Sequence, residues 1–277
     1  MITQYRIGLI LLLLLLSLSS CVRTVTEESL FYPHRTPALS DSTTFRSIEL
    51  RASDGVMLRG KIIGAPHYQR SMICFVGNAE SIYRTFNYYA ILSQKTECNL
   101  YLIDYRGFGI SDSAKPTFAS IIKDALLIFD TVRVRTPSQP LFLFGYSIGT
   151  VFATAVASER AADGLILIAP MTNAEETIKA FERELPWYLR WFIWLKPEAK
   201  LQNPNAQPVE LIKQVTEPLL VMHGERDNLI PIALGRKLFA SAASSEKRFL
   251  PVPKRGHSEW IALESPYTDS LKLFLIR

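Results

Sequence analysis

Ser147 is the residue of this chain whose surroundings point most directly to chemistry. It lies at the centre of the pentapeptide GYSIG, a G-x-S-x-G pattern. The apolar run PLFLF precedes this pattern, and the helical segment IGTVFATAVASE follows it. A serine held in a strained strand-to-helix turn needs flanking positions with almost no side chain, and glycines meet that need. The start of the helix then directs free amides and a positive dipole end at the reaction centre.

A serine hydroxyl is a poor nucleophile at neutral pH, so Ser147 needs a base. The chain has four histidines. His34 and His67 both precede the apolar runs that would form the catalytic edge of a sheet. His223 ends an apolar run in LLVMHGERD, whereas His257 follows FLPVPKRG and precedes the last helical segment. Of these, His257 lies downstream of an acid that itself follows a strand.

The acid must hold the imidazole in one tautomer and stabilise the imidazolium that forms during the reaction. Asp227, in HGERDNLIP just after the penultimate strand, is the favoured candidate. Glu225 lies two residues earlier and should sit earlier in the turn. Glu175, in the loop after GLILIAP, is a second alternative.

Four ordered motifs give the chain a resemblance to the α/β-hydrolase superfamily. They are similar to HGN, DYRGxGxS, GxSxG and HGxxDxxVP of one branch, and here they are VGNAE, DYRGFGIS, GYSIG and HGERDNLIP. The match extends from roughly residue 45 to the C-terminus. In this family Asp104 and Arg106, both in the second motif, would be structural and would order the loop that contains them.

The resemblance implies roles for five residues. The family's chain order of serine, acid and histidine is followed by Ser147, Asp227 and His257. Two backbone amides would form the oxyanion hole, one from the residue after the nucleophile, Ile148, and one from the loop after the third strand, Asn78.

The chain departs from the family pattern at two positions of the oxyanion loop. Val76 replaces the customary histidine, and Glu80 stands where a small residue is usual. The missing histidine usually supports loop geometry rather than chemistry, because the donor is a backbone amide. The departure therefore concerns the shape of the oxyanion hole more than activity.

The elements that must position these residues follow from the apolar runs. FRSIELRASDGVMLRGKII, with Asp54-Gly55 at its turn, predicts an antiparallel hairpin. Later runs are uniformly apolar and alternate with helical segments, which indicates a parallel sheet covered on both faces. We therefore predict an α/β protein, and the resemblance of its motifs implies the α/β-hydrolase fold. Its mostly parallel, twisted sheet would have an N-terminal antiparallel hairpin, helices on both faces and a helical cap insertion.

The cap is expected at about residues 171–207, where no strand is predicted. Four of its apolar residues fall at helical spacing and could form one stripe: Trp187, Trp191, Trp194 and Leu195. The stripe could pack the cap onto the body. Alternatively, it could line the substrate site or face a membrane, since tryptophan favours the lipid interface.

The N-terminus is predicted to be a targeting segment, outside the fold. Residues 1–20 contain one arginine, an apolar block over 7–16 that is too short to cross a bilayer, and small residues before Cys21. LSSC resembles the bacterial lipobox, in which cleavage leaves a lipid-modified N-terminal cysteine. The alternative is an ordinary signal peptide or an uncleaved anchor with a coincidental cysteine.

The predicted domains follow from this leader. Residues 1–20 would be the lipoprotein signal peptide, residues 21–44 a polar, proline-marked tether, and residues 45–277 the catalytic domain. Two or more acyl chains on Cys21 would anchor the protein stably. Val22, in place of aspartate after the cysteine, resembles an outer-membrane address. We therefore expect attachment to the outer membrane of a bacterial cell envelope, facing the periplasm.

Two further cysteines and the charge exclude other classes of function. Cys74 and Cys98 are expected as small buried hydrophobic residues, although an exported protein could pair them in a disulfide. Neither their spacing nor that of the histidines suggests a metal site. The net charge of +5 comes from scattered basic residues, so we predict no nucleic-acid binding.

Together these features predict a membrane-tethered serine hydrolase, similar to esterases, lipases or peptidases. It would cleave an ester, thioester or amide bond through an acyl-enzyme, without cofactor or metal. Its partners would be a small-molecule or lipid-like acyl substrate and the membrane, through Cys21. Two alternatives stay open. One is an acyltransferase with the same triad, and the other is a catalytically idle envelope-binding lipoprotein, supported by the altered oxyanion loop.

Overall fold

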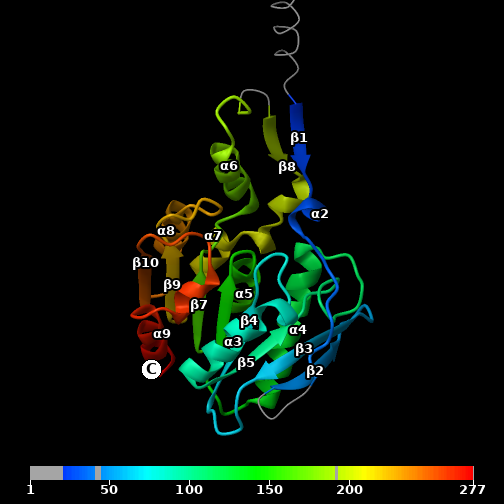
Figure 1. Ribbon diagram of the computed structural model, residues 1–277, viewed down its shortest axis with the longest axis vertical. Helices are drawn as coiled ribbons and strands as arrows, with labels where there is room; N and C mark the ends of the chain where they lie inside the picture. Colours follow the sequence, from blue (N-terminus) through cyan, green and yellow to red (C-terminus); the bar gives the residue numbers. More distant parts are fainter. Residues whose placement is uncertain (1–20, 41–44, 191–192, 277) are drawn as a thin grey trace, which may run out of the picture.

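An eight-stranded sheet forms the body of the part of the chain that the computed structural model describes, residues 21–40, 45–190 and 193–276 (Figure 1). The strand order is β10-β9-β7-β6-β4-β5-β3-β2. The bounds are β2 Phe45–Arg51, β3 Met57–Ile63, β4 Arg70–Phe75, β5 Cys98–Ile103, β6 Leu141–Tyr146, β7 Gly164–Ile168, β9 Leu219–Gly224 and β10 Lys247–Val252.

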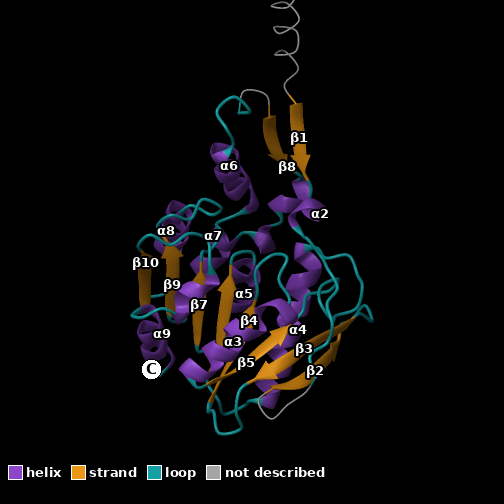
Figure 2. Ribbon diagram, viewed as in Figure 1, coloured by secondary structure: helices purple, strands orange, loops and turns teal. Residues whose placement is uncertain are grey.

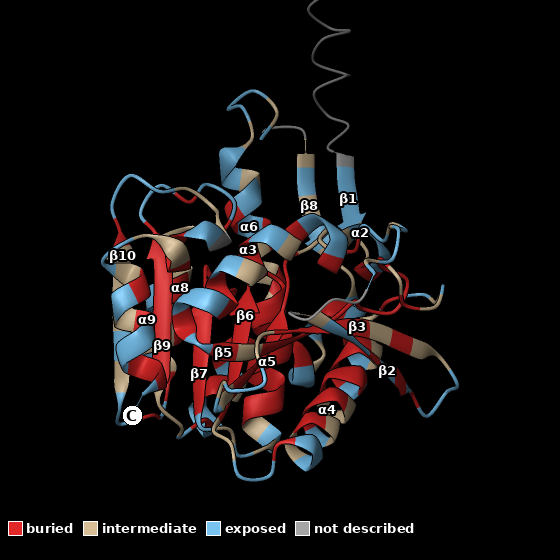
Figure 3. Cartoon of the chain, turned by 60° about the horizontal axis from the view of Figure 1, so that its bottom comes forward, coloured by how far each residue is buried: buried red, intermediate tan, exposed pale blue. Residues whose placement is uncertain are grey.

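The pairing agrees with the predicted arrangement of strands. β2 and β3 form the antiparallel hairpin, and β3 is also antiparallel to β5. The remaining pairs, from β5 through β4, β6, β7 and β9 to β10, are parallel. Every residue of β6, β7 and β9 is buried, as expected for parallel strands covered on both faces (Figure 3).

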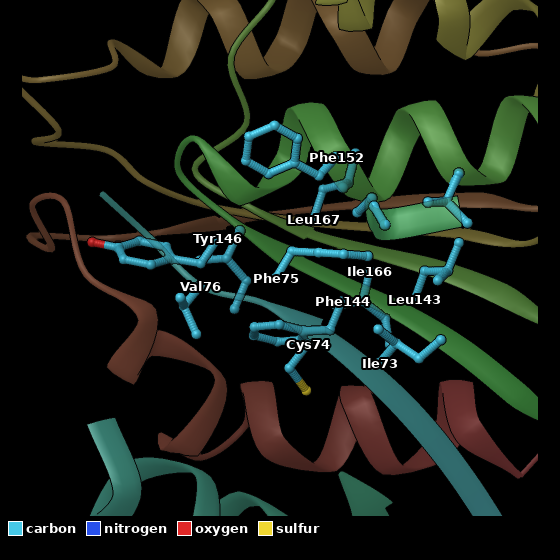
Figure 4. Packing of buried hydrophobic residues seen from close by; sticks show 14 of the residues in the cluster. Ile73, Cys74, Phe75, Val76, Leu143, Phe144, Tyr146, Phe152, Ile166 and Leu167 are labelled. Carbon is cyan, nitrogen blue, oxygen red and sulfur yellow. The ribbon is translucent and has the colours of Figure 1, made fainter. Parts of the chain in front are cut away.

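Helices cover both faces of this sheet (Figure 2). The long ones are α3 Ile82–Thr96, α4 Phe118–Arg135, α5 Gly149–Glu159, α8 Ile232–Ser241 and α9 Tyr267–Leu275. α3 contacts α9, and α4 contacts α5. In Figure 4 Phe152 of α5 and Cys74 of β4 project to opposite sides of the strands, with helices beyond each. Cys74 and Cys98 are free and buried, so the prediction of buried thiols is confirmed.

Buried charges join the hairpin to the helical layer. Arg106 donates to both carboxylate oxygens of Asp124 on α4, from Nε and Nη2, each at 2.7 Å. Its Nη1 donates to Asp54, in the turn between β2 and β3, at 2.6 Å. The Arg106 and Asp124 side chains are 7% and 5% exposed. Arg106 thus has a structural role, as the family resemblance implies: it links the turn of the hairpin to α4.

The cap differs from its prediction, because it contains a strand. Within residues 171–207 the structure has α6 Ala174–Glu184, β8 Ile193–Pro197 and two short 3-10 helices, η1 Ala199–Gln202 and η2 Pro204–Ala206. β8 pairs in parallel with β1, Cys21–Val25, in a separate two-stranded sheet. The expectation of no strand here was wrong because the partner strand comes from a segment about 170 residues away. Three short helices connect the cap to β9 and the N-terminal segment to the body: α7 Pro208–Leu211, η3 Ile212–Gln214 and α2 Glu27–Leu30.

The predicted helical stripe of the cap is also absent from the described residues. Trp187 lies in a turn after α6, and Trp194 and Leu195 lie in β8, where successive side chains point to opposite faces. Trp187 and Trp194 are 73% and 61% exposed, so they do not pack the cap onto the body. Leu195 is partly buried against the core. Trp191 lies outside the described residues.

Residues 21–40, expected as a tether, run along the domain instead. Glu27 and Phe31 are buried, and Arg35 forms a β-bridge with Gly109. The polar, proline-rich composition of this segment predicted a solvated tether. It gave no sign of the contacts, because only a few individual residues of the segment make them. The predicted signal peptide, residues 1–20, lies outside the described residues. Among the helices that the structure describes, none has the length and hydropathy needed to cross a membrane.

We expect Arg106→Ala to lower the free energy of unfolding by about 3–5 kcal/mol, because it leaves the buried Asp124 carboxylate without its partner. Urea denaturation followed by circular dichroism would measure the loss. Arg160→Ala is the matched control: it breaks an exposed bidentate pair with Asp130 and should cost about 1 kcal/mol or less. Equal losses in the two variants would contradict the structural role of Arg106.

Candidate active site

Ser147 lies in a sharp turn between β6 and α5. Its φ is +54°, in the left-handed region that a side chain rarely adopts, and the residue is 8% exposed. The flanking glycines are required sterically. A Cβ on Gly149 would lie 2.1 Å from the Phe75 carbonyl oxygen, and one on Gly145 would lie 2.8 Å from the Gly149 oxygen. The G-x-S-x-G pattern therefore marks a place where helix and sheet backbones touch.

Three side chains from different loops form one hydrogen-bonded series. His257, after β10, lies with Nε2 2.9 Å from Ser147 Oγ, and its Nδ1 is 2.7 Å from Asp227 Oδ2. An ionised carboxylate only accepts hydrogen bonds, so Nδ1–H donates to Asp227. Nε2 is then free to accept from the Ser147 hydroxyl. The structure thus brings together the predicted nucleophile, base and acid.

Asp227 is held as a buried carboxylate after β9. Its Oδ1 accepts from the backbone amides of Leu229 and Ile230 at 3.0 and 2.8 Å. Burial alone would raise the pKa of Asp227, but hydrogen bonds from His223 and His257 and from the Ile230 amide hold its pKa well below the ordinary value. The carboxylate is therefore ionised at neutral pH.

The alternatives for the acid do not take this position. Glu225 is exposed, and Glu175 pairs with Lys179 at 2.5 Å on the surface of α6. His223 is a contributor that sequence reasoning missed. Its Nε2 is 2.7 Å from the Ile230 carbonyl and 3.4 Å from Asp227 Oδ2, so it supports the loop that carries the acid. The sequence did contain a signal for this role: His223 ends an apolar strand and lies four residues before Asp227, close enough to contact the acid.

The predicted oxyanion residues flank the serine. Ile148 begins the turn into α5, Asn78 follows β4, and both line the cavity that contains Ser147. The loop around Asn78 is shaped by Glu80, whose carboxylate accepts from the Gly77 amide at 2.7 Å. The Tyr105 hydroxyl donates to the Val76 carbonyl at 2.9 Å. The two departures from the family motif therefore lie in a loop with its own internal supports.

Comparisons with known proteins show the family of this chain. The family described as Serine aminopeptidase, S33 matches residues 66–211, slightly more than half of the 277 residues. The chain belongs to this family. Lysophosphatidylserine lipase ABHD12 of Bos taurus is 36% identical over 152 residues, which are 51% of this chain and 37% of that protein. The chain therefore matches well under half the length of this relative.

Two other proteins are similar over nearly the whole chain, one in sequence and one in fold. Alpha/beta hydrolase domain-containing protein WAV2 of Arabidopsis thaliana is 26% identical over 271 residues, 90% of this chain and 87% of that protein. The solved structure of the Pyrococcus furiosus esterase PF2001 has a TM-score of 0.71 at 17% identity, and the match covers 90% and 98% of the two chains. The predicted α/β-hydrolase fold is confirmed, and the family places the chain among the serine hydrolases.

A cavity of about 410 Å³ opens beside Ser147, and its walls are mostly apolar. It lies between the N-terminal segment, the cap and the loop after β9. The lining residues are Val25, Ser29, Leu30, Tyr32, Asn78, Ser147, Ile148, Met171, Thr177, Ile178, Phe181, Leu195, Leu229 and Ile230. A larger cleft of about 570 Å³ lies between α2, the start of α4 and residues 198–204 of the cap; its lining is largely polar and charged and contains none of the predicted site residues. The cavity at Ser147 is therefore the candidate substrate site.

The lowered pKa of Asp227 predicts a pH-dependent contribution to stability. A carboxylate with a depressed folded-state pKa stabilises fully above its unfolded pKa of about 3.9 and loses that contribution as pH falls below it. The free-energy difference between the wild type and Asp227→Asn should therefore shrink as the pH is lowered from about 5 towards 2. Urea denaturation of both proteins across this range measures it, and a difference that stays constant with pH would contradict the prediction.

Proposed function

We propose that this protein is a membrane-tethered serine hydrolase that cleaves carboxylic esters of lipid-like substrates. The observation that carries the proposal is the hydrogen-bonded series from Ser147 Oγ through His257 to Asp227. A serine hydroxyl on a strained turn, an imidazole within reach of it and a buried ionised acid behind the imidazole are the parts that nucleophilic acyl transfer requires.

In this mechanism the Ser147 oxygen attacks the ester carbonyl while His257 Nε2 takes the hydroxyl proton. The negative oxygen of the tetrahedral intermediate accepts hydrogen bonds from the Asn78 and Ile148 amides. His257 then gives its proton to the departing alcohol, and an acyl-enzyme remains on Ser147. Water attacks this ester with His257 again as base, so that one ester and one water give one acid and one alcohol. Asp227 stays ionised and stabilises the imidazolium in both halves.

The cavity supports an ester of an apolar acyl group over a peptide. A substrate with a free amino terminus needs a carboxylate or comparable acceptor at its binding site, because a buried unpaired ammonium is costly. None of the described residues that line the cavity carries a carboxylate. An apolar chain suits the leucine, isoleucine, phenylalanine and methionine side chains of the walls. The names of ABHD12, a lysophosphatidylserine lipase, and of the Pyrococcus esterase support the same class of substrate.

Membrane tethering is supported by the predicted lipobox and by the surface next to it. β1 begins at Cys21 and pairs with β8 of the cap, and the described side chains of both strands are exposed or half-buried (Figure 3). Val22 of β1 and Trp194 of β8 are paired and exposed, and Trp187 and Tyr188 of the cap are exposed as well. Aromatic residues of this kind favour the interface between lipid and water. We therefore propose a lipid anchor at Cys21 that holds the enzyme at the outer membrane, on its periplasmic side, with the cap towards the lipid.

We expect Ser147→Ala to abolish labelling by a fluorophosphonate probe and to lower kcat for p-nitrophenyl esters by at least about 10⁴-fold, since it removes the nucleophile. The full chain in detergent would be assayed with acetate, octanoate and hexadecanoate esters, with Ser158→Ala as a matched control on the outer end of α5. Labelling that persists in Ser147→Ala, or a folded wild type that neither labels nor turns over, would overturn the proposal.

A further inference from the structure

The N-terminal segment of residues 25–32 is hydrogen-bonded to the oxyanion loop. The Asn78 side chain makes the connection: its Nδ2 donates to the Leu30 carbonyl at 2.5 Å, and its Oδ1 accepts from the Tyr32 amide at 3.2 Å. The same Oδ1 accepts from the Ala79 amide at 2.9 Å, and Ala79 has a φ of +59°. One side-chain amide thus joins the loop to a segment 46–48 residues earlier in the chain.

This segment is itself fastened to the body and to the cap. Phe31 is buried, and its ring centroid lies 5.1 Å from that of Phe118 at the start of α4. The Glu27 carboxylate accepts from the Phe118 amide at 2.5 Å, and the Glu27 amide donates to Glu198 in the cap at 3.1 Å. A buried aromatic ring and a buried carboxylate with a partner are features of a packed element, not of a solvated linker.

The segment also forms one wall of the cavity beside Ser147. Val25, Ser29, Leu30 and Tyr32 supply this wall, and the facing wall comes from the cap and from the loop after β9. In Figure 1 the blue segment with α2 descends from β1 beside the body, between the cap and α4. Without it the apolar side chains of the cap would face solvent instead of a cavity.

We propose that residues 25–32 belong to the active site and have two roles in it. They close a subsite for a single acyl chain, and through the Asn78 side chain they fix the loop whose amide stabilises the oxyanion. This inference rests on the proposed hydrolase function. In the loop that lacks a histidine at position 76, the bridge from Asn78 to Leu30 and Tyr32 adds a support from outside to the hydrogen bonds made by Glu80 and Tyr105.

The first test separates the Tyr32 amide from the Tyr32 side chain. Tyr32→Pro and Tyr32→Ala both remove the ring, but the proline variant alone also loses the N–H that donates to Asn78. Phe31 has φ −108° and ψ 132°, a conformation that a following proline accepts. We expect kcat of Tyr32→Pro to be about 10- to 100-fold below that of Tyr32→Ala with similar KM, since small misplacements of catalytic groups cost this much. Equal kcat values in two folded variants would overturn the positioning role.

The second test fills the subsite. We expect Leu30→Trp to lower kcat/KM for the octanoate and hexadecanoate esters by roughly tenfold more than it lowers kcat/KM for the acetate ester, because a bulkier wall excludes long chains first. Leu273→Trp, on an exposed leucine of α9, is the matched control and should keep the wild-type chain-length profile. An unchanged profile in Leu30→Trp would overturn the acyl-subsite role.

Failure of this inference is distinguishable from failure of the proposed function. A wild type that labels with fluorophosphonate at Ser147 supports the hydrolase, whatever the variants do. If that protein is active and both tests give the contradicting result, only the role of residues 25–32 is overturned. A folded wild type without labelling overturns both proposals. Circular dichroism and thermal unfolding of every variant establish that each one is folded.

Discussion

The close approach of Gly149 to the Phe75 carbonyl is the contact on which the rest of the site depends. It brings the first turn of α5 against the end of β4, where any side chain on Gly149 would collide with backbone. The loop that leaves β4 carries Asn78, and the turn that enters α5 carries Ser147 and Ile148. Ile148 is bonded to Ser147, so this backbone contact concerns the other donor: it brings the loop of Asn78 close to the nucleophile. Because backbone atoms make the contact, side-chain motion cannot loosen it.

The parallel sheet brings the remaining groups to the same edge. β4, β6, β9 and β10 all end there, so Asn78, Ser147, Asp227 and His257 meet although they are far apart in sequence. Each loop has its own support. His223 holds the loop of the acid through the Ile230 carbonyl, and Glu80 holds the oxyanion loop through the Gly77 amide. The site thus lies at one edge of the sheet, and the acid loop and the oxyanion loop are each held by a hydrogen bond of their own.

The parts of this structure that could be predicted are those with local or strongly periodic signals. Uniformly apolar runs predicted the parallel strands, Asp54-Gly55 predicted the hairpin, and the motif around Ser147 predicted a strand-to-helix turn that the structure contains. The order of acid and histidine after the serine was enough to select side chains that lie within hydrogen-bonding distance.

What could not be predicted depends on pairing between distant segments. β8 needs β1 as its partner, and neither segment has the length or alternation that would identify a strand by itself. The bridge from Asn78 to residues 30–32 involves backbone groups, which every residue carries, so no residue type announces it. The role of Glu80 could not be predicted either. A carboxylate where the family has a small residue suggests a distorted loop, and only the structure shows that it accepts a hydrogen bond from the Gly77 amide.

The parallel pairing of β1 with β8 has a mechanical consequence. Five consecutive residues of β1, starting at Cys21, are in register with β8. Tension applied at Cys21 acts along the two strands, so their hydrogen bonds bear it as shear and share it simultaneously. Part of the load passes into the cap through β8, and part continues along residues 25–32. A chain pulled from this end therefore transmits force both to the cap beside Ser147 and, through the Asn78 side chain, to the oxyanion loop.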